Sequence, residues 1–176
     1  MNKTLVIHPA DPSTDFLSKI YEGRGWEVIR QREDTIRTKY IKERIKDNDR
    51  IIMLGHGTPY GLIGGMNFII NQTHVHLLRE KELVGIWCNA DQFFKKYGLN
   101  GFYTGMIISE VREANYLGID TTDDEVNYSN ALFTEAITES IVHPNMLERA
   151  TNLYGNGLFR KGNPIIEYNE VRMYYR

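Results

Sequence analysis

A histidine and the only cysteine of this 176-residue chain each follow a short apolar run. His56 follows residues 51–55, and Cys88 follows residues 83–87. An imidazole beside a thiol can take its proton or hold it as a thiolate, and either turns the sulfur into a nucleophile. If the two runs are neighbouring strands, His56 and Cys88 are the candidate catalytic pair.

Backbone groups beside this pair have the right types to assist it. Gly55 and Gly57 lack a Cβ, so a substrate can approach their backbone closely. The amides of Gly57 and Cys88 are candidate donors to a developing oxyanion, which needs fixed N–H groups. Asn89 and Asp91 stand where the next helix should begin. The positive end of that helix would lower the pKa of the thiol.

The pattern of these residues is similar to that of a known peptidase group. An apolar strand ending in His-Gly (Ile51–Gly57), followed by an apolar strand ending in Cys (Leu83–Cys88), resembles the caspase/gingipain-like cysteine peptidases. That group includes caspases, legumains, gingipains and separases, and the resemblance covers mainly residues 1–110. It implies that His56 acts as general base or acid and Cys88 as nucleophile, with no third acid.

The same resemblance implies a substrate preference. In these peptidases the loop after the first strand contributes to the pocket for the residue before the scissile bond. By resemblance, Asp11 or Asp15 would line that pocket here. A carboxylate at that position implies a preference for Arg or Lys before the cut.

Alternating strand and helix patterns predict the fold. Apolar, β-branched runs bounded by turn residues indicate strands at 4–8, 26–29, 50–54, 83–87 and 101–108. One-face apolar spacing and capping residues indicate helices at 16–21, 35–47, 73–82, 89–98, 110–117, 122–142 and 145–153. This alternation predicts one three-layer α/β domain over 1–176, with a mainly parallel sheet in caspase-like or Rossmann-like order and helices on both faces.

Two further segments lie outside this alternation. Residues 61–72, with three glycines, are typical of a loop or small hairpin. Ile165–Tyr168 has the composition of a short strand.

Such a sheet also predicts where a ligand binds. The site lies beyond the carboxyl ends of the parallel strands, where the strand order reverses. The residues expected to line a pocket there all follow a predicted strand: His8, Asp11, Asp15, Gly55, Asn89, Asp91, Ser109 and Glu110. Glu113 follows the same strand as Ser109 and borders the same cleft in this interpretation.

Composition excludes several classes of protein. Hydrophobic residues make up 41% of the chain, which excludes a disordered tail. No apolar run approaches the roughly 20 residues of a membrane span, so we expect no membrane partner. The net charge of −2 argues against a general nucleic-acid binder. A single cysteine and the absence of a signal-peptide pattern lead us to expect a cytoplasmic protein.

Charge is distributed unevenly along the chain. Residues 24–50 contain nine Lys or Arg against six acids, whereas residues 113–148 contain eight acids and no Lys or Arg. Either these segments are solvated helix faces of opposite sign, or the acidic one attracts a basic substrate or partner.

Each candidate residue also has a structural interpretation. A lone cysteine at a strand end is often an inert core residue. His8 can be structural, and Ser109 can cap a helix. His74 and His76 would share a face only on a strand, and no matching ligand accompanies them, so we expect neither a metal site nor a cofactor.

The sequence therefore leaves three functions open. The first is a cysteine hydrolase with a His56–Cys88 dyad, acting on a peptide or small molecule. The second is a non-catalytic α/β module that binds a small anionic or nucleotide-like ligand at the strand ends. The third is a protein that binds a basic partner through its acidic region. No feature of the sequence indicates the oligomeric state.

Overall fold

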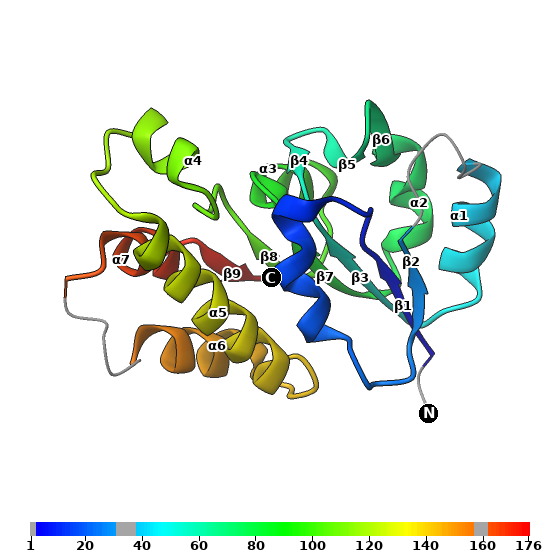
Figure 1. Ribbon diagram of the computed structural model, residues 1–176. Coiled ribbons are helices and arrows are strands. Elements are labelled where there is room, and N and C mark those ends of the chain that lie inside the picture. The colour runs from blue at the N-terminus through cyan, green and yellow to red at the C-terminus, as the bar shows by residue number, and fades with distance from the viewer. Residues whose placement is uncertain (1–2, 31–37, 157–161) are drawn as a thin grey trace.

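A computed structural model describes residues 3–30, 38–156 and 162–176, and within them one sheet of six strands forms the centre (Figure 1). Its order is β2-β1-β3-β7-β8-β9. The strands are β1 (Thr4–Ile7), β2 (Glu27–Ile29), β3 (Arg50–Leu54), β7 (Glu82–Ile86), β8 (Gly101–Thr104) and β9 (Met173–Tyr175). All neighbours pair in parallel except β8 and β9, which are antiparallel. The predicted mainly parallel α/β sheet is confirmed, although β8 ends four residues earlier than expected.

Helices cover both faces of this sheet, which makes three layers (Figure 1). On one face η1 (Pro12–Ile20), α5 (Asp123–Ser140), α6 (Met146–Gly155) and α7 (Pro164–Glu170) enclose one apolar cluster. On the other face α1 (Thr38–Lys46), α2 (Val75–Leu78) and α3 (Ala90–Tyr97) enclose a second one. Strands buried from both sides need apolar residues at nearly every position, and β1 and β3 have them.

Side-chain caps set several helix boundaries. Thr122 accepts a hydrogen bond from the Glu125 amide and begins α5, as its position before an acidic turn predicted. Asp11 caps η1 by accepting from the Ser13 amide, so this helix begins four residues before the predicted start. The helix predicted at 35–47 appears as α1 from Thr38, and its residues 35–37 lie outside the described ranges.

The strand predicted at Ile165–Tyr168 is wrong, because these residues belong to α7. Asn163 accepts hydrogen bonds from the amides of Ile165 and Ile166, and Pro164 fits the first helical turn. Cap and proline together favour a helix over the β propensity of two isoleucines.

A small three-stranded sheet lies between β3 and β7 along the chain. It consists of β4 (Gly57–Thr58), β5 (Gly61–Gly64) and β6 (Asn67–Ile70), where a loop or hairpin was expected. Gly61 has a φ of 145°, and a Cβ there would lie 1.9 Å from the carbonyl oxygen of Ile70. The turn into β5 therefore requires glycine. A short η3 (Gln72–His74) leads from β6 into α2.

A last helix, α4 (Val111–Tyr116), follows β8 and precedes α5. Within the described ranges, none of the helices combines the length and apolarity that crossing a bilayer requires.

Candidate functional site

The register of β3 and β7 sets the relation between His56 and Cys88. Every paired residue of β7 carries a number 32 higher than its partner on β3, up to the last pair, Leu54 with Ile86. His56 and Cys88 are also 32 apart. The Gly55 amide donates the final ladder hydrogen bond to the Ile86 carbonyl at 3.0 Å. The two candidates thus stand opposite each other, directly beyond the paired part of two neighbouring strands.

The two side chains also belong to the same face of the sheet. Successive side chains of a strand point to opposite faces. Leu54 and Ile86 pack in the cluster under η1 and α5, whereas Trp87 packs in the cluster on the other side. Beyond the strand ends, His56 contacts Ser13 of η1 and Cys88 contacts Ile107, which belongs to the same cluster, so both side chains lie on the η1 and α5 side.

On that face His56 contacts the loop that follows β1. Its Nε2 lies 2.6 Å from the Ser13 hydroxyl oxygen, which lies 2.7 Å from Oδ1 of Asp11. Oδ1 of Asp11 is itself 3.8 Å from Nε2. An ionised carboxylate only accepts, so the single Ser13 proton goes to Asp11 and the hydroxyl accepts from Nε2–H. This arrangement leaves Nδ1 as the nitrogen of a neutral His56 that can take a proton.

A pocket of about 320 Å³ opens beside His56. Asp11 lines it from the loop after β1, and Gly64 and Gly65 line it from the turn between β5 and β6. Arg112, just inside α4, stands at the same pocket. Strand β1 lies between β2 and β3, so the strand order reverses where the loops after β1 and β3 meet. This is the position at which doubly wound sheets bind ligands.

Cys88 has different surroundings. Its sulfur lies 3.7 Å from the Ile107 carbonyl oxygen and 3.9 Å from Oε1 of Glu113. Burial, followed by the nearby carboxylate of Glu113, raises the pKa of the thiol to about 12. The sequence led us to expect a lowered pKa, and that expectation is wrong, because desolvation and a negative neighbour both oppose the thiolate.

The Glu113 carboxylate is fixed in place. Its Oε2 accepts from the Ser109 amide at 2.7 Å, the Ser109 hydroxyl at 3.1 Å and the Glu110 amide at 3.2 Å. Oε1 is thereby turned toward Cys88. Ser109 and Glu110, both expected near the site, reach it through this carboxylate.

The structure does not bring the two candidates into contact. Among the described residues, the side-chain hydrogen bond of His56 goes to Ser13, and those of the Cys88 thiol go to Ile107 and Glu113. Backbone register therefore makes the pair neighbours, while each side chain turns toward a different loop.

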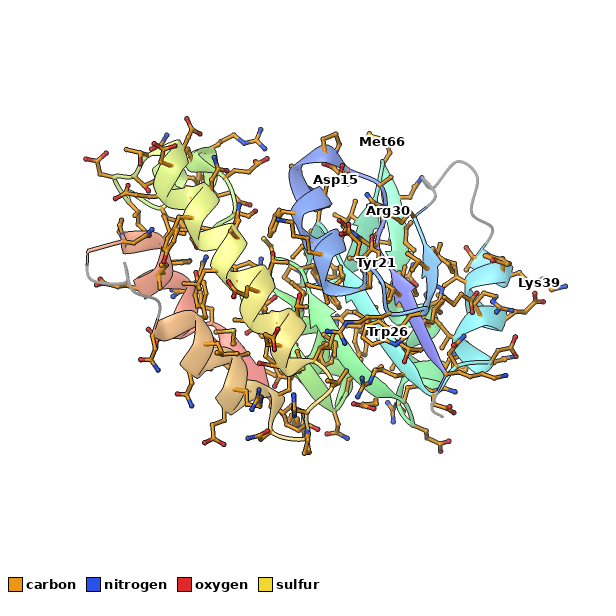
Figure 2. The ribbon with its side chains drawn as sticks, turned by 60° about the horizontal axis from the view of Figure 1, so that its bottom comes forward. Asp15, Tyr21, Trp26, Arg30, Lys39 and Met66 are labelled. Atoms are coloured by element: carbon orange, nitrogen blue, oxygen red, sulfur yellow. The ribbon has the colours of Figure 1, made fainter. Side chains whose placement is uncertain are left out.

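His8 and Asp15 do not line the pocket but belong to a network of polar contacts around Tyr21 and Arg30, and Figure 2 labels Asp15, Tyr21 and Arg30 of this network. The His8 ring is fully buried, with Nδ1 3.0 Å from the Tyr21 hydroxyl and Nε2 3.3 Å from that of Thr14. Arg30 donates to Tyr21 and forms an ion pair with Asp15. Burial, assisted by the positive charge of Arg30, lowers the pKa of His8 to about 4. Both residues thus hold the loop in place and leave Asp11 as the carboxylate at the pocket.

The other residues predicted to lie at the site have structural roles. A Cβ on Gly57 would lie 2.0 Å from Cδ1 of Trp87, so packing against that indole explains this glycine. Asn89 begins α3 with a left-handed φ of 67° and makes no side-chain cap, and Asp91 pairs with Lys95 at 3.1 Å. Gly55, with a φ of 134°, lies against Pro9 and the His8 ring.

Sequence reasoning missed the role of Ser13. The Asp-Pro-Ser pattern signals a capped helix start, and that cap is present. The contact between Ser13 and His56 spans 43 residues, so no local pattern could reveal it.

His74 and His76 lie on η3 and α2 and so do not share a strand face. Within the described ranges, no group of three or more His, Cys, Asp or Glu side chains is placed to hold a metal ion.

Comparison with known proteins adds no family. No protein-family model matches the chain, and no curated protein matches it.

Proposed function

We propose that this protein is a cysteine hydrolase of peptidase type, in which His56 and Cys88 act as a pair. The observation that carries the proposal is the shared register: the two residues stand opposite each other at the ends of neighbouring parallel strands, on one face of the sheet. We expect a base and a nucleophile that follow adjacent strands to meet when their side chains rotate.

The chemistry follows from the two side chains. Nδ1 of His56 takes the Cys88 proton while the sulfur bonds to the substrate carbonyl carbon. The C–N bond then breaks, the leaving amine carries the proton away, and water hydrolyses the thioester to restore the thiol. Because the pKa of Cys88 is raised to about 12, the thiol is protonated at rest. Proton removal therefore accompanies attack, and a preformed thiolate is not required.

Two local rearrangements engage the pair. His56 leaves Ser13, and Cys88 leaves the Ile107 carbonyl and Glu113. Both contacts of the sulfur are long, and contacts between catalytic groups often tighten only when substrate binds. Asn89, which follows the cysteine, holds a left-handed conformation of the kind that concentrates at functional sites.

The pocket beside His56 would select the substrate residue before the scissile bond. Asp11 places a half-exposed carboxylate at a hollow of about 320 Å³, large enough for one long side chain. A cationic Arg or Lys side chain in this hollow would be attracted by the Asp11 carboxylate, and we therefore expect cleavage after a basic residue. A reducing compartment such as the cytoplasm keeps the single thiol available.

The test uses an irreversible probe and matched variants. A peptide chloromethyl ketone ending in Arg is incubated with the native protein, Cys88→Ala, His56→Ala and Ser13→Ala, and the adduct is located by mass spectrometry. We expect an adduct on Cys88 that His56→Ala slows about a hundredfold or more, since general-base catalysis contributes roughly 10² to 10⁴. Ser13→Ala should retain or accelerate it, because His56 is released.

Two results would sink the hydrolase. One is a Cys88 that reacts at the same rate in His56→Ala. The other is the absence of any adduct together with no hydrolysis of Arg, Lys or Leu peptide amides. An adduct on Ser13 would transfer the nucleophile to that residue.

A second function has its own support. The raised pKa of Cys88 and the bond between His56 and Ser13 describe a stable resting site at the strand switch, with Arg112 beside it. Such a crevice suits a non-catalytic module for a small anion. Thermal stabilisation by a nucleotide, unchanged in Cys88→Ala and without hydrolysis by either form, would favour this alternative.

A further inference from the structure

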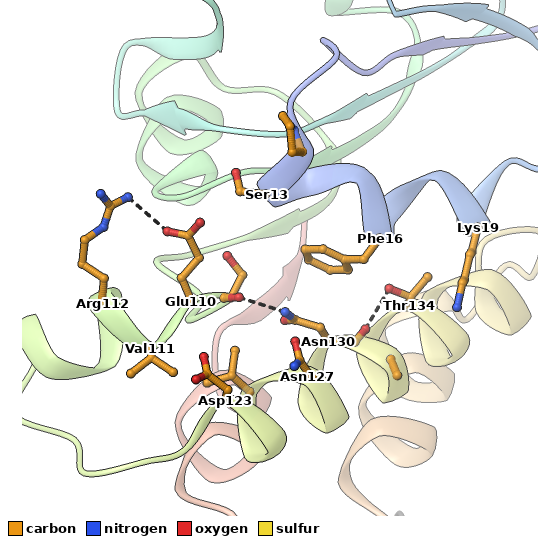
Figure 3. Close-up of a pocket in the computed structure, with 14 residues that line it drawn as sticks. Ser13, Phe16, Lys19, Glu110, Val111, Arg112, Asp123, Asn127, Asn130 and Thr134 are labelled. Carbon is orange, nitrogen blue, oxygen red and sulfur yellow. Dashed lines mark hydrogen bonds and ion pairs between the residues drawn. The ribbon is translucent and has the colours of Figure 1, made fainter.

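A groove larger than the His56 pocket runs between η1 and α5 (Figure 3). Its volume is about 630 Å³, and residues 109–112 line one end. Figure 3 shows Phe16 projecting from η1 toward α5, on which Asn127 and Asn130 lie. The groove is therefore a channel with one wall from each helix.

The character of the groove changes along its length. The ion pair Glu110–Arg112, 3.1 Å apart, lies at the end near Ser13. Phe16, which lies between Ser13 and Lys19 on η1, and Val126 give the groove apolar lining. At the far end stands Lys19, beside Thr134 (Figure 3). Within the described ranges the Lys19 ammonium has neither an ion pair nor a hydrogen bond, so its charge is available to a ligand.

The groove adjoins the proposed catalytic site. Ser13 lines the groove and contacts His56, which lines the smaller pocket. Arg112 lines both hollows. A chain whose basic side chain enters the smaller pocket can therefore continue into the groove past Ser13.

The helix geometry fixes the spacing of such a ligand. A 3₁₀-helix rises about 2 Å per residue, so Phe16 lies ~6 Å and Lys19 ~12 Å along η1 from Ser13. An extended peptide advances about 3.3 Å per residue. Phe16 is then two peptide residues, and Lys19 four, from the residue held beside Ser13.

We propose that the groove binds the substrate polypeptide itself. This proposal rests on the proposed function. The ligand carries a basic residue at the His56 pocket, an apolar residue two positions away on Phe16, and an acidic residue four positions away on Lys19. Charge complementarity at both ends, with an apolar contact between them, makes a polypeptide of mixed charge the fitting class.

The test measures binding in Cys88→Ala, which cannot cleave the probe. Two C-terminally amidated peptides with fluorescein on the N-terminus, Glu-Ala-Leu-Ala-Arg and Arg-Ala-Leu-Ala-Glu, are titrated by fluorescence anisotropy, one for each chain direction. For the tighter peptide, adding Lys19→Glu should weaken binding about fivefold, because attraction of up to ~1 kcal/mol is lost. Adding Ala131→Trp, which fills the groove from an exposed position of α5, should weaken it about tenfold.

Matched variants make the test specific. Lys39→Glu reverses an exposed charge on α1, far from the groove, and should leave affinity unchanged (Figure 2). Replacing the peptide's Glu by Lys should restore affinity for the Lys19→Glu protein. Circular dichroism and thermal melting confirm that each variant is folded.

The outcomes separate the two proposals. Binding that ignores both Lys19→Glu and Ala131→Trp, or no binding of either peptide, overturns the groove even if the chloromethyl ketone labels Cys88. Binding that depends on Lys19 without any adduct on Cys88 upholds the groove and overturns the hydrolase alone.

Discussion

The carboxyl ends of β1 and β3 differ from the end of β7 in how their polar side chains are satisfied. His56 is 38% exposed and takes part in a chain of polar contacts through Ser13 and Asp11. Cys88, at the same level of the sheet, is shielded by a carbonyl and one carboxylate at long distances. Strand pairing sets where the backbones of the two residues lie, whereas the loops beyond the strands set the contacts and the exposure of each side chain.

The largest expected effect concerns Gly57, because its packing against Trp87 links the segment after β3 to the segment after β7. Gly57 follows His56, and a Cβ there would meet the buried Trp87 indole at 2.0 Å and the Gly61 carbonyl oxygen at 2.7 Å. Gly57→Ala should lower the free energy of unfolding by about 3 kcal/mol or more, because neither neighbour can move away cheaply. Urea denaturation measures this change.

Gly105→Ala is the matched control, because its added Cβ would lie no closer than 3.4 Å to Tyr174. Its effect should stay near that of an ordinary surface change, within about 1 kcal/mol. Equal losses in the two variants would show that Gly57 and Trp87 do not tie the regions together.

The next effect concerns His8, which is buried and contacts the hydroxyls of Tyr21 and Thr14. The pKa of His8 is about 4 in the folded chain and 6.5 as its ordinary value, so between these pH values only the unfolded chain takes up the proton. The contribution of a neutral His8 is complete above pH 6.5. It falls as the pH drops toward 4, by up to about 3 kcal/mol at 1.36 kcal/mol per pKa unit.

Urea denaturation of the native protein and His8→Gln at pH 7, 5.5 and 4.5 measures this dependence. The variant should lose less stability on acidification than the native protein. Parallel pH profiles of the two proteins would contradict this dependence of stability on His8.

The smallest effect concerns the thiol. Glu113→Gln removes the negative charge beside Cys88 while keeping acceptors for Ser109 and Glu110, and should lower the pKa of the thiol. One pKa unit would raise the rate of iodoacetamide labelling at pH 8 about tenfold. Glu110→Gln, whose carboxylate pairs with Arg112, should raise it less. An unchanged rate in Glu113→Gln would assign the shielding of Cys88 to burial alone.

The sequence predicted the parts of this molecule that depend on short-range patterns. Apolar runs located β1, β3 and β7, and a threonine before three acids located the start of α5. Ile165 and Ile166 misled because an asparagine cap outweighs β propensity. The directions of the side chains at the site could not be predicted from the sequence, because the contacts of His56 with Ser13 and of Cys88 with Glu113 join distant segments.

The small sheet of β4, β5 and β6 has an evolutionary consequence. It leaves the main sheet after His56, and the chain returns through η3 and α2 to β7. Hydrogen bonding between β3 and β7 sets their alignment, so the length of this excursion does not. Insertions or deletions at its exposed β5–β6 turn, where Met66 is 94% exposed, would leave the histidine and the cysteine neighbours. Relatives that preserve this architecture can therefore differ in the number of residues between the two, and a fixed spacing would fail to identify them.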